Sequence, residues 1–115
     1  MNSDIERLEE ILRRIEKAQR FTATGEVDFF RNDLIQEATI RQLEIIGEAA
    51  NALNPEVRGL APDIPWKAMI DARHKMIHFY FKIDLFVVWN AVEEFLPPLQ
   101  AQIEGLLIKL RAPSN

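Results

Sequence analysis

The sequence contains no cysteine and only four glycines among its 115 residues. Without cysteine, the chain can form neither a disulfide nor a thiolate metal site. The scarcity of glycine and the lack of long β-branched alternation favour helices over strands. No apolar run reaches the roughly 18 residues that a membrane span needs, and the charged N-terminus is unlike a signal peptide. We therefore expect a cytoplasmic protein without a membrane segment.

An excess of positive charge is also missing, because 18 acidic residues outnumber 14 basic ones and the formal net charge is −4. An acidic surface argues against sequence-independent wrapping of nucleic acid by the whole molecule. The segment from Lys67 to Lys82 is different, since it carries four cations and a single acid, Asp71. This locally basic segment leaves room for a site that binds individual phosphate groups.

The spacing of apolar residues predicts an all-α fold in a single domain, residues 1–115. A capping box at Ser3 predicts that the first helix begins near Asp4, and it should end by Gly25. Further helices are expected over residues 28–53, 65–78 and 85–96, and a last one continues past two prolines to about residue 111. The expected architecture is an up-and-down bundle of four to five helices.

The helix expected over residues 28–53 has one apolar side at helical spacing. That side consists of Leu34, Ile35, Ala38, Leu43, Ile46, Ala50 and Leu53. Small residues at Gly47, Ala49 and Ala50 leave room for a neighbouring helix to come close. Asn54-Pro55 should end this helix, and irregular chain is expected from there to residue 64.

The helix expected over residues 85–96 is apolar on more than one face. Such a helix must be covered on both sides, either by its own bundle or by a second chain. In a chain of 115 residues the second copy is the better explanation. We therefore predict a homodimer.

Residues 65–84 contain both histidines of the chain and its only tyrosine. Arg73, His78 and Tyr80 form the pattern R-x4-H-x-Y. An arginine fork matches phosphate oxygens, and an imidazole exchanges a proton near neutral pH. Such a pair can cleave RNA without a metal: the base removes the 2′-OH proton and the cation stabilises the phosphate. An arginine and a histidine satisfied in or near a core would give the same pattern, and spacing alone leaves both interpretations open.

His74 and His78 are four residues apart and therefore share one face of a helix, with Asp71 one turn earlier. This spacing can nucleate a metal site. However, the chain has no third nitrogen ligand and lacks the H-E-x-x-H pattern, so we predict no bound metal and no other cofactor. Glu48 belongs to the polar stripe of its helix, where a surface role and a supporting role near the site are both open.

Four segments, in order along the chain, resemble the HepT family of toxins within the HEPN superfamily. They are Ile45-Ile46-Gly47-Glu48-Ala49, Pro62-Asp63-Ile64-Pro65-Trp66, the R-x4-H-x-Y motif, and Val88-Trp89 followed by Leu96-Pro97. The resemblance covers roughly residues 28–110. It implies an all-helical homodimer whose paired motifs meet in a cleft at the interface. It also implies a metal-independent ribonuclease that inhibits growth by cutting tRNA or mRNA, with Arg73 and His78 in the catalytic roles.

The resemblance further implies a partner, an antitoxin of the minimal nucleotidyltransferase type, as in a type II- or VII-like toxin–antitoxin system. Such an antitoxin silences its toxin by attaching AMP to the motif tyrosine, here Tyr80, which places phosphate beside Arg73. His74 stands where the family often has asparagine, and with Lys75 it is a candidate contact for the substrate. The alternative function is a non-catalytic helical module that binds the nucleotidyltransferase and is AMPylated by it.

Overall fold

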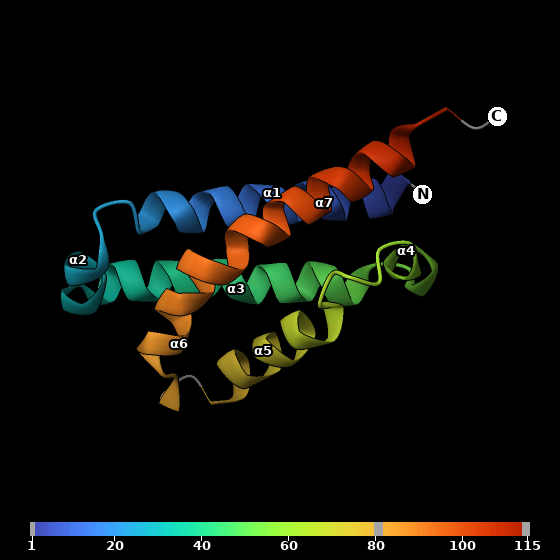
Figure 1. Ribbon diagram of the computed structural model, residues 1–115. Coiled ribbons are helices and arrows are strands. Elements are labelled where there is room, and N and C mark those ends of the chain that lie inside the picture. The colour runs from blue at the N-terminus through green and yellow to red at the C-terminus, as the bar shows by residue number, and fades with distance from the viewer. Residues whose placement is uncertain (1, 80–81, 114–115) are drawn as a thin grey trace.

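The computed structural model describes residues 2–79 and 82–113, and these residues are helical with short connections and no strand (Figure 1). The four long helices are α1 (Asn2–Phe21), α3 (Asp33–Ala52), α5 (Trp66–His78) and α7 (Leu96–Arg111). The short helices are α2 (Glu26–Arg31), α4 (Pro55–Gly59) and α6 (Leu85–Asn90), and a π-helical turn, Ala91–Phe95, joins α6 to α7. The predicted all-α fold is confirmed.

Helix α3 is the central element, with α1 and α7 on one side of it and α5 on the other (Figure 1). Helices α1 and α3 run antiparallel, because Asp4 near the start of α1 accepts a hydrogen bond from the backbone N–H of Asn54, just beyond the end of α3, at 3.0 Å. Helix α7 returns along α1, and Arg111 near its end pairs with Glu9 at 2.6 Å. The beginning of α1 and the end of α7 therefore lie together.

The core is formed where the long helices face one another. Its buried members include Leu8, Ile11 and Ile15 of α1, Leu43, Ile46 and Ala50 of α3, and Leu99, Ile103 and Leu106 of α7. Phe29 of α2 is also fully buried, and its ring contacts that of Trp89 at a centroid distance of 5.4 Å. In the part of the chain that the structure describes, no helix combines the length and the apolar character that crossing a membrane requires.

The structure divides the helix expected over residues 28–53 into two, with the break at Asn32. The backbone of Asn32 is extended, and its side-chain oxygen accepts hydrogen bonds from the N–H groups of Leu34 and Ile35 at 3.0 and 3.3 Å. Asparagine is among the residues best suited to this capping position, because it satisfies donors that have no partner within the helix. Leu34 was expected on the buried side, but in the first turn of α3 it is 73% exposed.

Two other boundaries also differ from the sequence-based expectation. Helix α1 begins at Asn2, so Ser3 lies inside the helix, and the first turn is held instead by the contact of Asp4 with the Asn54 backbone. Beyond α3 the chain is not irregular, because the Asn54 side chain accepts a hydrogen bond from the Glu56 N–H at 2.9 Å and Pro55 begins α4. Proline suits a first helical position, since the N–H that it lacks would have no partner there.

A new helix, α7, begins at the two prolines, where the sequence predicts that the preceding helix is interrupted. Asp84 caps α6 through a hydrogen bond that its side chain accepts from the Phe86 N–H at 2.9 Å. Pro97 and Pro98 have no N–H to donate to the turn before them, and that turn is the π-helical one. Helix α7 then runs from Leu96 to Arg111.

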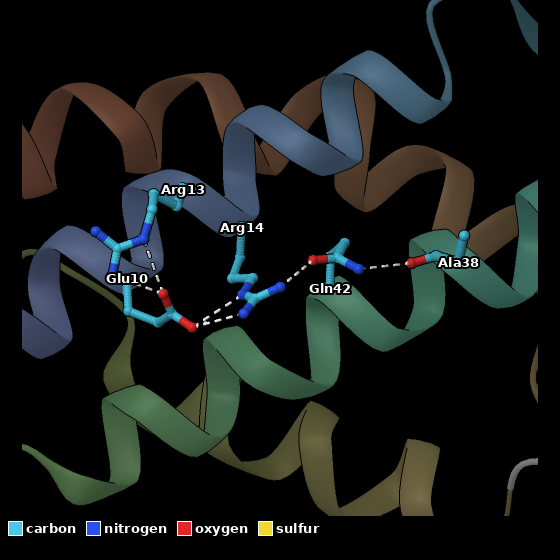
Figure 2. Close-up of polar contacts among 5 residues, drawn as sticks. All are labelled: Glu10, Arg13, Arg14, Ala38 and Gln42. Carbon is cyan, nitrogen blue, oxygen red and sulfur yellow. Dashed lines mark hydrogen bonds and ion pairs between the residues drawn. The ribbon is translucent and has the colours of Figure 1, made fainter.

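A polar chain of contacts links α1 to α3 at mid-length, as Figure 2 shows. Arg14 donates two hydrogen bonds to one carboxylate oxygen of Glu10, at 3.0 and 2.8 Å, and a third to the side-chain oxygen of the buried Gln42, at 3.2 Å. Arg13 binds the other oxygen of Glu10. The hydrogen bonds from Arg14 are the main cause that lowers the pKa of the Glu10 carboxyl.

This network predicts how the stability of the fold depends on pH. Folding lowers the pKa of Glu10, so its ionised carboxylate stabilises the folded state. This stabilisation is fully present above the pKa of the unfolded chain, about 4.3, and is lost as the pH falls through the lower pKa of the folded chain. Glu10→Gln should lower the free energy of unfolding at pH 7 by about 0.5–1 kcal/mol, and the difference from wild type should shrink in acid. Urea unfolding measured from pH 7 down to pH 3 tests this.

The control is Glu16→Gln, an exposed residue of the same helix that pairs with no other described residue. Glu16→Gln should change the free energy of unfolding little at any pH. Equal losses for the two variants at pH 7 would contradict a stabilising role for the Glu10 network.

Candidate functional site

Helix α5 is fixed at its start by Trp66. The indole N–H of Trp66 donates to the carbonyl oxygens of Arg58 and Ala61, both at 3.1 Å, while the ring is buried. Pro65, expected as the first helical residue, is the capping residue just before it. Burial of Met69 and Met76 then orients α5, so that one face of the helix meets the core.

Helices α3 and α5 approach most closely at Gly47. A Cβ atom added to Gly47 would lie 2.5 Å from the Cβ of Arg73 and 2.6 Å from the carbonyl oxygen of Met69. Real Cβ atoms essentially never come this near to other heavy atoms, so the helices can pack at this distance only if residue 47 has no side chain. The expectation that Gly47 admits a neighbouring helix is confirmed, and that neighbour carries Arg73.

Arg73 is half-buried, and its Nε atom is buried without a hydrogen-bond partner. Among the described residues it is the single buried side-chain nitrogen or oxygen in this condition. A buried donor of a charged group that has no acceptor is costly, by about 1–3 kcal/mol or more. The Arg73 Nε–H is therefore a donor that the described residues leave without an acceptor.

His74 and His78 lie on the exposed side of α5. Their ring centroids are 4.3 Å apart, with 43° between the ring planes. Neither imidazole has a hydrogen-bond or ion-pair partner among residues 2–79 and 82–113. Both rings are thus free to meet a ligand or a second chain.

The structure does not bring Arg73 and His78 together within one chain. Helix α5 is continuous through both residues, and five helical residues correspond to a rotation of about 140°. Arg73 packs against α3 through its Cβ, whereas His78 is the exposed last residue of α5. No bend in α5 between the two residues brings them together.

One of the four cations in the locally basic segment, Lys67, is paired with an acidic residue. Lys67 donates a hydrogen bond to Asp71 at 2.7 Å across one turn of α5. This contact is the main cause that lowers the pKa of Asp71 and raises that of Lys67, so both groups remain charged and offset one another. Lys75 is exposed on the same helix and remains available to a substrate phosphate.

Glu48 is exposed on α3 and has no hydrogen-bond or ion-pair partner in the described part of the chain. It forms no hydrogen bond or ion pair with Arg73 or with either histidine, and a supporting role for it near the site stays a prediction. Tyr80 lies outside the described residues.

Two apolar cavities lie along another face of α5, and neither of them is lined by His74 or His78; sequence reasoning located this surface only as a generally apolar α6. A cavity of about 480 Å³ lies between α3, α5 and the α6–α7 segment, and an adjoining one of about 430 Å³ extends toward Phe79. Met76 and Val87 line both cavities. Phe86 and Val87 of α6 are 65% and 60% exposed, which is unusual for large apolar side chains on adjacent positions.

Comparison with known proteins gives one consistent family. Residues 11–106 match the family model described as Ribonuclease HepT-like. A probable ribonuclease HepT from Thermococcus cleftensis is 41% identical over 102 residues, covering 86% of this chain and 91% of that protein. A candidate RNase from Methanocaldococcus jannaschii is 42% identical over 77 residues, covering 67% and 71%. A candidate RNase from Caldanaerobacter subterraneus subsp. tengcongensis is 34% identical over 103 residues, covering 89% and 92%. No solved structure gives a significant match.

The contact at Gly47 predicts that Gly47→Ala is destabilising, although alanine is the better helix former. The added methyl group meets the Cβ of Arg73 and the backbone of Met69, so the helices must move apart, at a cost of about 1–3 kcal/mol. Urea unfolding gives this difference directly. The matched control is Gly105→Ala in α7, where an added Cβ meets nothing within 4 Å and should stabilise the chain by up to about 1 kcal/mol. A Gly47→Ala chain as stable as wild type would show that the close approach is not required.

Proposed function

Because the chain belongs to the HepT-like ribonuclease family, we propose that it is the toxin of a toxin–antitoxin pair and cleaves RNA without a metal ion. Arg73 and His78 carry the reaction. The observation that carries this assignment is that the buried Nε of Arg73 and the exposed His78, on the same helix, have no hydrogen-bond or ion-pair partner among the residues that the structure describes. A structural arginine would have its buried donor satisfied inside the fold.

The role of Arg73 follows from its geometry. A guanidinium presents several N–H donors in a fixed plane, and a phosphate oxygen is the acceptor that matches this arrangement best. An RNA phosphate bound by the guanidinium brings the scissile bond to the cation. Charge that develops on the phosphate during the reaction is then stabilised by a group already held in place by the packing of α5 on α3.

His78 acts on protons. As a neutral imidazole it accepts the proton of the ribose 2′-OH, and the 2′-oxygen attacks the adjacent phosphorus. The bond from phosphorus to the 5′-oxygen breaks, and that oxygen leaves with a proton from an imidazolium. The products are a 2′,3′-cyclic phosphate and a 5′-hydroxyl. Acid–base assistance of this kind contributes about 10²–10⁴-fold, and no step needs a metal ion.

The reactive site is formed by two copies of the chain. Arg73 and His78 point to different sides of α5 in one copy, so a two-fold partner is the direct way to place both at one phosphate. The exposed apolar residues of α6 and the adjoining cavities supply surface for such a partner. The imidazolium that forms when His78 accepts the 2′-OH proton can give that proton to the leaving 5′-oxygen, so each site needs one Arg73 and one His78.

The partner that controls this toxin is a minimal nucleotidyltransferase antitoxin, which transfers AMP to Tyr80. Tyr80 follows His78 by two residues, so its modification would place a phosphate close to the catalytic residues. An added negative charge with strong acceptor oxygens competes with RNA for Arg73. The substrate class, tRNA or mRNA, is a matter for direct cleavage assays.

The central prediction concerns His78→Ala. Loss of the imidazole should lower the rate of RNA cleavage by about 10²–10⁴-fold and abolish growth inhibition, without unfolding the chain, because the side chain is exposed. Wild-type protein should keep cutting RNA in the presence of EDTA. Gel-based cleavage of total tRNA and mRNA, with circular dichroism on each variant, provides the measurement.

Arg73→Ala should lose activity to a similar degree, and Arg31→Ala, an exposed arginine on α2, is the control that should not. A His78→Ala variant that cuts at the wild-type rate would disprove the assignment. If purified chain never cuts RNA but gains the mass of one AMP on Tyr80 when mixed with the nucleotidyltransferase and ATP, the protein is instead the non-catalytic module.

A further inference from the structure

Two imidazoles on consecutive turns of α5 lie close enough to share one ligand. His74 and His78 are four residues apart, and their ring centroids are separated by 4.3 Å with the planes inclined at 43°. Residues four apart lie on the same face of a helix, one turn from each other. The distance between the backbones of His74 and His78 is therefore set by α5 and not by a mobile loop. Rotation of two exposed side chains is enough to aim one nitrogen of each ring at a common atom.

The surroundings leave these nitrogens available. Both rings are exposed, and neither has a hydrogen-bond or ion-pair partner in the described part of the chain. Asp71, one turn earlier, is already bound to Lys67 at 2.7 Å. No group of three histidine, aspartate or glutamate side chains converges among residues 2–79 and 82–113. The site therefore offers two nitrogen donors and is otherwise open to water.

We propose that His74 and His78 chelate a first-row transition-metal ion such as Zn²⁺, one nitrogen from each ring, and that the bound ion switches RNA cleavage off. Imidazole nitrogen is a preferred ligand of Zn²⁺, Cu²⁺ and Ni²⁺, whereas Mg²⁺ prefers oxygen. Water completes the coordination of the ion. This proposal departs from the expectation, based on the sequence, that the chain binds no metal.

Inhibition follows from the chemistry of a single imidazole. One ring nitrogen of His78 would be bonded to the metal and the other would carry a hydrogen, so no lone pair remains to accept the 2′-OH proton. The cation also draws substrate phosphate toward itself and away from Arg73. This inhibitory effect rests on the proposed function of His78, whereas metal binding by the two histidines does not.

The first measurement is calorimetric titration of the full chain with Zn²⁺, after removal of any purification tag. His74 and His78 are the only histidines in the sequence, so an imidazole site can be assigned without ambiguity. Wild type should bind one ion per chain, and His74→Asn and His78→Asn should each weaken binding by at least about tenfold. Lys75→Ala is the control on the same helix and should bind as wild type does. Mg²⁺ in excess should not displace Zn²⁺.

The second measurement is RNA cleavage against Zn²⁺ concentration, with each variant compared to its own rate without metal. Wild-type cleavage should fall as the site fills and return with EDTA, while any remaining cleavage by His74→Asn should not respond over the same range. Unchanged Zn²⁺ affinity in either asparagine variant would overturn the chelate, and full cleavage by Zn²⁺-loaded wild type would overturn the inhibition. If the metal-free chain does not cut RNA at all, the proposed function fails, and calorimetry still decides the metal site.

Discussion

The close approach of α3 and α5 at Gly47 is the contact on which the rest of the site depends. The two helices are so close that a Cβ atom on residue 47 would clash with the Cβ of Arg73 and with the carbonyl oxygen of Met69. The absence of one side chain on α3 thus fixes the position of the arginine on α5. Because α3 is also the helix against which α1 packs, the arginine is tied to the centre of the bundle.

From that contact the two sides of α5 acquire different properties. The side that faces α3 holds Arg73 with a buried and unpartnered Nε atom, while the outer side presents His74 and His78 as a close pair of exposed rings. The two residues to which we assign the reaction, Arg73 and His78, therefore lie on different sides of α5 in one chain. The exposed Phe86 and Val87 of α6 are apolar surface that the proposed second copy would cover.

Sequence patterns predicted the elements that depend on local chemistry. The start of α6 at residue 85, the extent of α5 and the new helix at the two prolines follow from residues within a few positions of each boundary. The break at Asn32 was missed because an apolar period continues across it, and only the capping hydrogen bonds show where the chain turns. The sequence indicated that Gly47 is small enough for a neighbouring helix to come close. It did not indicate that this neighbour contacts Gly47 through Arg73, because that contact depends on tertiary packing and not on periodicity.

The chain belongs to the HepT-like ribonuclease family, and the geometry of α5 is the basis of our proposal that Arg73 and His78 act in a site shared by two copies. The most direct test is complementation between two inactive variants, Arg73→Ala and His78→Ala, mixed after unfolding and refolding together. If each site takes Arg73 from one copy and His78 from the other, mixed dimers contain one intact site, and the mixture should recover about a quarter of the wild-type rate of RNA cleavage. A mixture as inactive as either variant alone would contradict a site shared between two chains.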